Sequence, residues 1–495
     1  MPRIALLLAL TALAFATALG VPFYLDDFSI LSDAILTSPD GWYRSWGVLQ
    51  TRPLTWFSFW LNYQLGGENP AGYHAVNLAL HLANIYLAAT ILPAFLPAPA
   101  AAIAATLFAL HPIQTEPVLY VFARATLLMA LFCLLSLRSW NSGRPWHAVA
   151  WFALALLAKE ECVTFPLFLA CLHLATKRED RHLPPIGAML GLSVLAGLRG
   201  VYVTTVIVGS GAGAQAGIAT PHYLATQGAA IWLYVRQLLI PTPFPLESPL
   251  HPNALYALGW IPILALAAWG LANPDLRRPP FWFTAGLALL LASSSVFPTA
   301  DLSADRRLYL PLLAWGAAAG LLLAHWPRIV YPLAAILVLL TARETLAWQD
   351  PRAFWQRIVD SRPTPRAYIH YARQLPHAQA LDTLNALERF APDHPQSASE
   401  QGRIWLELGN APNALAAFGR ALALEPANAR AVNNRGVALD RMGQREAALA
   451  DFHRALSLDP CLFDARLNLK RLGQPVPTRA ACQYTPQQKK TLEGN

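Results

Sequence analysis

The chain has 495 residues, of which 55% are hydrophobic and 13% are charged, and its mean hydropathy is +0.35. Soluble globular proteins carry about 25% charged residues, so these totals exclude a protein that is soluble throughout. The formal net charge is +8, but the basic residues lie between apolar runs, which is typical of loops that orient membrane helices and not of a nucleic-acid-binding surface.

The first apolar run, residues 4–21, follows a single arginine, Arg3. Two interpretations are open. The run is either a spanning helix with a cytoplasmic N-terminus or a signal peptide cleaved near its Ala-Thr-Ala stretch. We adopt the spanning helix as the prediction.

Eleven further apolar runs follow between residues 74 and 346. Basic residues between the runs mark the cytoplasmic loops, and they include Arg138, Lys177, Arg277 and Arg328. This assignment requires an even number of crossings between Lys177 and Arg277, but three apolar runs lie there: 185–208, 223–241 and 254–272. One of them therefore does not cross, and the weakest candidate for a span is 223–241. The prediction is therefore a polytopic helical bundle of about 11 spans over residues 1–347, with an external first loop at 22–73 and an external C-terminal part.

Charged side chains gather at the ends of these runs on the side predicted to be external. Charge at a membrane edge is costly and usually has a function, although any single residue can simply anchor a loop at the interface. Cations in such a place can hold a phosphate, while a carboxylate takes the proton of a hydroxyl. The residues concerned are Asp26, Asp27, Glu116, Arg124, Lys159, Glu160, Arg199 and Arg306.

A self-similar pattern with a period of 34 residues begins after a linker at 348–360, and Pro392, Pro426 and Pro460 mark its ends. This is the period of the tetratricopeptide repeat, in which pairs of helices stack into an α-solenoid. We predict a degenerate repeat at 361–394, full repeats at 395–428 and 429–462, a capping helix up to 473 and a flexible tail at 474–495. The groove of such an array binds a peptide or protein, or else the short array only packs on the membrane part.

Five cysteines without a Cys-X-X-Cys pair argue against a structural zinc site. Cys461 and Cys482 lie in the C-terminal part. In an external compartment they form either a disulfide that fixes the end of the chain or two separate thiols.

Five stretches occur in order before the repeats: DDFSI, RPLTWFSFWLNYQLGGENPAGYHAVNLALHLANI, HPIQTEPVLYVFARATLL, LAKEECVTFPL and ADLSADRRLYLP. With the repeats, they resemble the glycosyltransferases of the C fold class. More narrowly, they resemble the transmembrane and tetratricopeptide-repeat O-mannosyltransferases and their bacterial relatives. Two positions depart from this resemblance, because relatives often have a second histidine where Gln114 stands and an acidic residue where Thr126 stands.

The resemblance implies an inverting transfer from a polyprenyl-phosphate-linked sugar to a hydroxyl of a periplasmic protein or glycan that the repeats bind. Asp26 or Asp27 would be the general base, with Glu116 also in the catalytic group. Arg199 and Arg306 would contact the phosphate, while Arg124 and Lys159 would do so or instead pair with Glu116 and Glu160. The expected substrate-binding set is Arg52, His111, Arg124, Lys159, Glu160, Arg199, Arg306 and Tyr309.

The spacing of the residues shows no set of metal ligands. Binding of a divalent cation stays open as an alternative, because carboxylates and His111 lie near one another in the predicted site. The expected location is the bacterial inner membrane, with the N-terminus in the cytoplasm and the repeats in the periplasm. Two other functions compete with the enzyme. A non-catalytic membrane scaffold would recruit partners through the repeats but has no need of Asp26 and Asp27. A transporter of lipid-linked sugars should carry polar residues at mid-membrane and inverted repeats, and neither is evident here.

Overall fold

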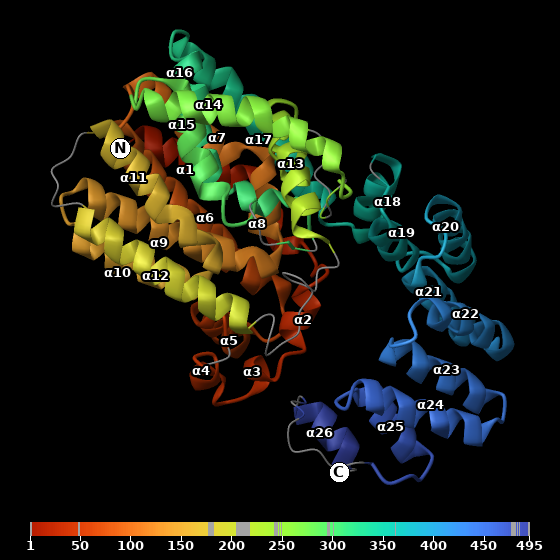
Figure 1. The fold of residues 1–495 in the computed structure, drawn as a ribbon. Helices are drawn as coiled ribbons and strands as arrows, with labels where there is room; N and C mark the ends of the chain where they lie inside the picture. Colours follow the sequence, from red (N-terminus) through yellow and green to blue (C-terminus); the bar gives the residue numbers. More distant parts are fainter. Residues whose placement is uncertain are drawn as a thin grey trace. The chain divides into compact units, whose positions relative to one another are not determined.

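The computed structural model shows a chain built from helices, and the residues it describes contain no strand (Figure 1). This confirms the predicted all-α class. The structure describes residues 2–47, 50–176, 183–203, 218–241, 246, 248, 250–294, 298–299, 301–361, 363–476, 482, 484 and 486–493. Lys177, which the topology prediction uses, lies outside these residues.

The chain divides into two compact units. The first comprises Met1–Leu31 and Asp40–Gln349, and the second comprises Ser32–Pro39 and Asp350–Asn495. The membrane helices and the repeats thus belong to different units, and each unit is described by itself.

Proline opens many helices of the first unit, as at Pro53, Pro70, Pro145 and Pro311, because its fixed φ suits the first helical position and it has no N–H to leave unpaired there. The α-helices are α1 (Pro2–Ala14), α2 (Asp27–Leu31), α4 (Gly41–Arg44), α5 (Pro53–Gly66), α6 (Pro70–Ile91), α7 (Ala98–Leu110), α8 (Thr115–Leu119), α9 (Arg124–Asn141), α10 (Pro145–Ala158), α11 (Phe165–Thr176), α12 (Leu183–Val201), α13 (Thr220–Leu239), α14 (Trp260–Ala272), α15 (Pro279–Leu290), α16 (Pro311–Leu323) and α17 (Val330–Ala347). The 3-10 turns are η1 (Ala18–Gly20), η2 (Leu92–Ala94), η3 (Pro112–Gln114), η4 (Val121–Ala123), η5 (Glu160–Thr164), η9 (Ala254–Gly259), η10 (Asp305–Leu308) and η11 (Pro327–Ile329).

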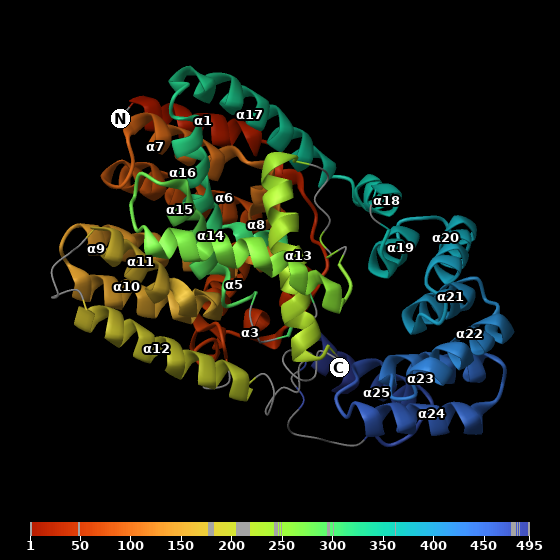
Figure 2. The ribbon, with the colours of Figure 1, turned by 45° about the horizontal axis from the view of Figure 1, so that its top comes forward.

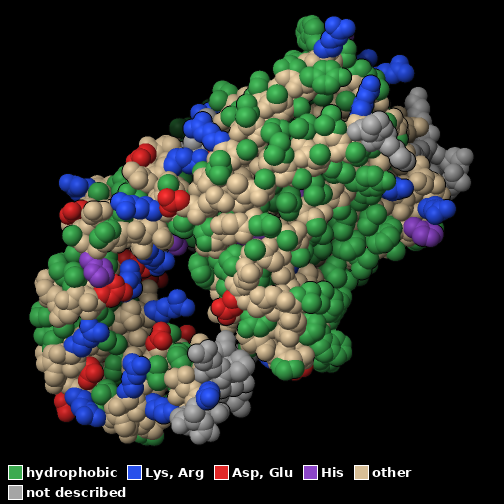
Figure 3. Space-filling model, turned by 180° about the vertical axis from the view of Figure 1, so that it is seen from behind, with side chains coloured by type: hydrophobic (Ala, Val, Ile, Leu, Met, Phe, Trp, Pro, Cys, Tyr) green, Lys and Arg blue, Asp and Glu red, His purple; other side chains and the backbone are tan. Residues whose placement is uncertain are grey.

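Among the described residues, six helical stretches are long and apolar enough to cross a membrane. They are Arg3–Gly20, Pro70–Ala94, Val121–Asn141, Leu183–Val201, Ala254–Ala272 and Pro327–Ala347. Four shorter apolar helices, α7, α10, α15 and α16, accompany them. Figure 3 shows hydrophobic side chains over broad areas of this unit. The chain is therefore a multi-pass membrane protein, and the count of about 11 spans stays a prediction.

Small residues let two of the shorter helices approach closely. A Cβ on Gly320 of α16 would lie 2.4 Å from the carbonyl oxygen of Ala100 in α7, and one on Gly316 would lie 3.3 Å from that of Ala104. Hydrocarbon supplies no hydrophobic force between helices, so such backbone-to-backbone packing is what holds them together.

The last helix of the first unit, α17, ends beside the first loop. The Tyr24 hydroxyl donates to the carbonyl of Trp348 at 2.7 Å, and the two rings meet edge to face with centroids 5.2 Å apart. The Gln349 side chain also donates to the carbonyl of Thr17 at 2.9 Å. The chain therefore leaves this unit next to the segment that carries Asp26 and Asp27.

The second unit consists of antiparallel helix pairs that follow one another (Figure 2). The second helices of successive pairs end at Phe390, Leu424 and Leu458, each two residues before a proline of the 34-residue pattern. Its helices are α3 (Ala34–Thr37), α18 (Pro351–Ser361), α19 (Pro365–Ala372), α20 (His377–Phe390), α21 (Pro395–Glu407), α22 (Ala411–Leu424), α23 (Ala429–Arg441), α24 (Arg445–Leu458), α25 (Phe463–Arg471) and α26 (Pro486–Glu493).

Glycine and phenylalanine fit together within each full repeat. A Cβ on Gly402 would come within 2.7 Å of the Phe418 ring, and one on Gly436 within 2.8 Å of the Phe452 ring. Only glycine leaves room for the ring there, so the recurring Gly and Phe positions mark one contact between the two helices of a repeat.

Both ends of the repeat region are more ordered than the sequence suggests. The expected linker, 348–360, is mostly helix α18, which buries Phe354 and Ile358, and its Trp355 stacks on His370 of α19 with centroids 4.7 Å apart. The expected flexible tail contains helix α26, whose last carbonyls, those of Thr491 and Leu492, accept hydrogen bonds from Lys470. A lysine at a helix C-terminus also suits the helix dipole.

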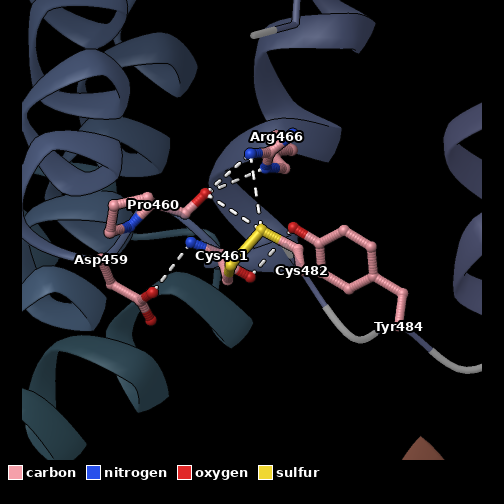
Figure 4. Close-up of a disulfide and its surroundings, with 6 residues drawn as sticks. All are labelled: Asp459, Pro460, Cys461, Arg466, Cys482 and Tyr484. Atoms are coloured by element: carbon pink, nitrogen blue, oxygen red, sulfur yellow. Dashed lines mark hydrogen bonds between the residues drawn. A yellow bond between two sulfur atoms is a disulfide. The ribbon is translucent and has the colours of Figure 1, made fainter. Parts of the chain in front are cut away.

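The two cysteines of the C-terminal part, Cys461 and Cys482, form a disulfide (Figure 4). Around it, the Tyr484 hydroxyl donates to the carbonyl of Cys461 at 3.1 Å, and the Tyr484 ring meets Phe463 edge to face. The bridge joins the end of the last repeat to the tail, which answers the question that the sequence leaves open. Disulfides persist in oxidising compartments outside the cytoplasm.

We expect this bridge to be detectable by thiol labelling. Cys133, Cys162 and Cys171 are free, so the denatured, non-reduced protein should accept three labels and the reduced protein five. The variant Cys461→Ser should expose one more thiol without reductant, because it releases Cys482. Intact mass after alkylation gives the count, and five labels before reduction would contradict the bridge.

Candidate functional site

The first loop presents two adjacent carboxylates in different surroundings. Asp27 is 1% exposed, and its two oxygens accept the backbone N–H groups of Tyr24 and Phe122 at 3.0 and 2.8 Å. Asp26 is exposed. It follows Leu25, whose φ of +45° is unusual for a residue with a side chain and turns the chain sharply at this point. Asp27 thus anchors the loop, and Asp26 projects from it.

The Tyr120 hydroxyl holds Asp26 in place. It donates to the Asp26 carboxylate at 2.8 Å and accepts the N–H of Asp26 at 3.1 Å. Burial, followed by the charges of Asp26 and Asp27, raises the pKa of Tyr120, so the hydroxyl keeps its proton. The loop carboxylate is thereby tied to the segment between α8 and η4.

A second carboxylate, Glu116 of α8, meets Arg306 of η10. The Glu116 side chain is almost fully buried. It accepts both the guanidinium of Arg306 at 2.5 Å and the backbone N–H of Arg306 at 2.9 Å. Asp301 accepts from the same guanidinium at 2.7 Å. Burial by itself would lower the pKa of Arg306, but Glu116 and Asp301 outweigh burial and raise it.

The segment around η5 supplies the next ion pairs. Glu160 receives a two-pronged contact from Arg52, one arm of which measures 2.9 Å. Lys159 lies 2.7 Å from Glu161 and donates to the Thr126 hydroxyl at 2.9 Å. Burial lowers the pKa of Lys159; Glu161 opposes this effect, and the nearby charges of Arg52 and Arg306 lower it further. The cations from three segments are therefore close enough to act on one another.

Arg307, next to Arg306, differs from Arg52, Lys159 and Arg306 in its hydrogen-bond partners. Its guanidinium donates to the Thr299 hydroxyl at 2.8 Å and to the carbonyls of Asp301 and Leu302 at 2.8 and 3.5 Å. Within the described part of the chain, no carboxylate lies at salt-bridge distance from it. A small cavity beside it is lined by Met129, Glu161, Cys162, Thr164, Leu289, Ser293, Arg307, Leu310 and Pro311.

Several known proteins are similar in sequence to this chain. Protein O-mannosyl-transferase F38B6.6 of Caenorhabditis elegans is 27% identical over 411 residues, which are 74% of this chain and 58% of that protein. Protein O-mannosyl-transferase TMTC3 of Mus musculus is 30% identical over 186 residues, or 33% of this chain and 20% of that protein. Protein O-mannosyl-transferase Tmtc1 of Drosophila melanogaster is 37% identical over 121 residues, which are 23% of this chain and 14% of that protein.

This chain resembles the protein O-mannosyl-transferases. It spans about 58% of the length of the first relative and a smaller part of the other two. No family model matches the chain.

Of the residues that the sequence singles out in this O-mannosyl-transferase-like chain, most meet in one cluster. It combines an exposed carboxylate, that of Asp26, with paired cations that are buried or partly buried, which suits proton removal next to an anionic group. The cluster contains Asp26, Asp27, Arg52, Glu116, Lys159, Glu160 and Arg306. Tyr120 links the loop carboxylates to the ion pairs, because it holds Asp26 and its own N–H donates to the carbonyl of Glu116. The pairing differs from the expected one, because Glu116 pairs with Arg306 and Lys159 pairs with Glu161.

Three other predicted residues hold local structure. His111 is 1% exposed; one ring nitrogen accepts the N–H of Ile113, and the other lies 3.2 Å from the carbonyl of Leu238. Tyr309 is buried, with its hydroxyl 2.8 Å from a ring nitrogen of His81. Arg199, at the exposed end of α12, donates to the carbonyl of Gln50 at 2.7 Å. Among the described residues, no hydrogen bond joins any of the three to the ion pairs named above.

Arg124 is buried among neutral oxygens. Its guanidinium donates to the side-chain oxygens of Asn77 and Asn62, both at 2.8 Å, and to the carbonyls of Ser58 and Tyr73. It also lies over the Phe59 ring, 4.6 Å from the centroid. Arg124 therefore joins α5, α6 and α9 and does not pair with Glu116.

We expect Arg124→Gln to impair folding and not donor binding. The change leaves several buried acceptors unpaired, which costs about 3 kcal/mol or more in the free energy of unfolding. The melting temperature in detergent should fall, while the apparent KM for a lipid-linked sugar, measured well below that temperature, should stay the same. A raised KM with an unchanged melting temperature would instead place Arg124 in the binding site.

Asp27 should make stability depend on pH. Burial, partly opposed by hydrogen bonds from backbone N–H groups, raises its pKa from 3.8 to about 7. The folded state then holds this proton more tightly than the unfolded chain, so stability falls as the pH rises from about 4 to about 7, by at most roughly 4 kcal/mol. Melting temperatures between pH 4.5 and 8 should show this slope in the wild type and in Asp26→Asn, but not in Asp27→Asn. Equal slopes in all three proteins would contradict it.

In the described ranges, no three His, Cys, Asp or Glu side chains are placed to hold a metal ion. The divalent cation stays an expectation.

Tyr120 is the main site residue that sequence reasoning missed. The signal was available, because it stands between Glu116 and Arg124 in the stretch HPIQTEPVLYVFARATLL, but a tyrosine at the end of an apolar run is usually an interfacial anchor.

Proposed function

We propose that the chain is an integral membrane glycosyltransferase of the extracytoplasmic side, which moves a sugar from a polyprenyl phosphate to a hydroxyl of an acceptor. Mannose is the first candidate, because the relatives are named protein O-mannosyl-transferases. The observation that carries the proposal is the exposed Asp26, held by Tyr120, whose own N–H donates to the carbonyl of Glu116, the partner of Arg306. Arg52 and Lys159 add further ion pairs.

Asp26 is the proposed general base. Its carboxylate takes the proton of the acceptor hydroxyl as that oxygen bonds to the anomeric carbon of the sugar. The bond between the anomeric carbon and the phosphate oxygen breaks, and polyprenyl phosphate leaves with the electron pair. Attack opposite the leaving group inverts the anomeric centre. Asp27 is unsuited to this step, because both of its oxygens are occupied by backbone N–H groups.

The leaving phosphate needs positive charge but no proton. Arg52, Lys159 and Arg306 supply it, and the carboxylate paired with each cation keeps that cation charged and oriented in the absence of donor. Arg307 is a further candidate, since its guanidinium donates to neutral oxygens. Arg199, which the sequence favours, donates to the carbonyl of Gln50 in the first loop and is not included in this proposal.

The repeats are proposed to bind the acceptor. Two observations support placing them on the same side of the membrane as Asp26. The chain leaves the first unit at Trp348, which is hydrogen-bonded to Tyr24, two residues before Asp26. The disulfide between Cys461 and Cys482 in the second unit favours a compartment outside the cytoplasm. In a bacterium this compartment is the periplasm, and the membrane is the inner one.

The test is transfer by the purified full chain in lipid nanodiscs. Radiolabelled polyprenyl phosphate mannose is the donor, and proteins extracted from the envelope of cells that lack the gene are the acceptors. The proposal expects label in protein and an equal release of polyprenyl phosphate. No transfer by the folded protein from mannosyl, glucosyl or N-acetylglucosaminyl donors would overturn it and would favour a scaffold that binds the same proteins without modifying them.

A further inference from the structure

Helix α13 carries a row of buried polar side chains. Tyr223, Thr226, Gln227, Tyr234 and Gln237 are each at most 2% exposed. Their spacing puts them along one side of the helix. Although α13 has 20 residues, it is not among the described helices that are apolar enough to span a membrane. Buried polar groups are costly unless they are hydrogen-bonded, so this row needs partners.

The partners lie in the segment that leads to Arg306. The Tyr223 hydroxyl donates to the carbonyl of Ser293 at 2.6 Å, and the Gln227 amide donates to that of Leu302 at 3.0 Å. The Gln237 amide donates to the carboxylate of Asp305 at 3.0 Å. The row on α13 therefore follows this segment as far as η10.

Tyr234 acts at the start of η10. The residue before this turn, Ala304, has no side chain that could cap it. The Tyr234 hydroxyl accepts the N–H of Ala304 at 2.9 Å and lies 3.3 Å from its carbonyl oxygen, to which it donates. One hydroxyl thus satisfies both backbone groups of the residue that precedes η10. Arg306 is the second residue of η10, and its own N–H is held by Glu116.

We propose that Tyr234 and Gln237 are positioning residues, which fix η10 so that Arg306 and Arg307 face the phosphate of the donor. This inference rests on the proposed function. Neither residue touches the ion pairs of the site; each acts through η10, Tyr234 through Ala304 and Gln237 through Asp305. The Arg306 side chain is 18% exposed and pairs with the buried Glu116, so a small displacement of the turn is enough to change what its guanidinium can reach.

The experiment uses Tyr234→Phe, which removes one oxygen and keeps the ring, and Gln237→Leu, which removes the amide. Tyr331→Phe is the matched control, because Tyr331 is 68% exposed on α17. The first measurement is amide hydrogen exchange of a peptide that covers residues 301–308, which does not require activity. Exchange should be faster in both α13 variants and unchanged in the control.

The second measurement is steady-state transfer from polyprenyl phosphate mannose. Loss of a buried hydrogen bond that orients the phosphate contact should raise the donor KM about tenfold, with a smaller change in kcat. In an Arg306→Gln background, Tyr234→Phe should have a smaller effect on KM, because only the contribution through Arg307 remains. A purely structural role would give an equal effect in both backgrounds.

Unchanged exchange in both variants would overturn the inference, as would a KM effect of equal size with and without Arg306. Failure of the proposed function is distinguishable. If the wild type transfers no sugar, the proposed function falls, and the exchange data still decide whether α13 holds η10.

Discussion

Replacing Asp26 with asparagine is expected to lower the rate of sugar transfer by about 10²-fold to 10³-fold or more. A positioned general base contributes about 10² to 10⁴ in rate, and an amide cannot accept the proton. The fold should persist, because the side chain is exposed and Asn can still accept the hydrogen bond from Tyr120. Transfer is measured with the lipid-linked donor in nanodiscs, over a pH range.

The matched control for this change is Asp40→Asn. Asp40 lies in the same loop, and its carboxylate is 66% exposed beside Arg44, so its loss should leave the rate unchanged. Tyr120→Phe should give an intermediate loss of about tenfold, since it removes the hydrogen bond that orients the base. A fully active Asp26→Asn variant would rule out Asp26 as the base and favour the scaffold function.

Replacing Arg306 with glutamine should have the second large effect, on stability and on activity together. The change leaves the Glu116 carboxylate, which is 3% exposed, without its cation. Breaking a buried ion pair in this way typically costs about 3–5 kcal/mol. The melting temperature in detergent should fall markedly, and transfer measured below that temperature should be weak, with a raised donor KM, because the phosphate loses a contact.

The double variant Glu116→Gln, Arg306→Gln separates the two effects. With both charges removed, no uncompensated charge is buried, so much of the lost stability should return. Transfer should stay low, because the cation is still missing. If the double variant regained activity as well as stability, Arg306 would serve only to neutralise Glu116.

Much of the architecture could be predicted because its signals are local. Long apolar runs identify membrane helices whatever their neighbours are. The tetratricopeptide pattern is visible because each glycine, such as Gly402, must face a ring such as Phe418 within its own repeat. Two segments were harder. Helix α18 and helix α26 form where the sequence suggests a linker and a flexible tail, since both depend on contacts with a neighbouring helix, such as that of Trp355 with His370.

The charged residues of the candidate site could be singled out from the sequence, but their pairings could not. Charges at the ends of apolar runs are conspicuous, and this draws attention to Asp26, Glu116 and Arg306. Which cation meets which carboxylate depends on how helices pack, and the sequence has no signal for that. Arg124 shows the difficulty, because the asparagines Asn77 and Asn62 that bind it look in the sequence like ordinary polar residues of helices.

The contact between Tyr24 and Trp348 has a kinetic consequence. Helix α18 begins at Pro351, only a few residues after the carbonyl that Tyr24 holds. If the repeats bind the acceptor and Asp26 is the base, as proposed, the acceptor is tethered to the unit that carries Asp26, and its encounter with the base is intramolecular. Short tethers give effective concentrations on the order of millimolar. Binding by the repeats can then be weak, which favours release of the modified product, and separating the repeats from the membrane unit should raise the acceptor KM much more than it lowers kcat.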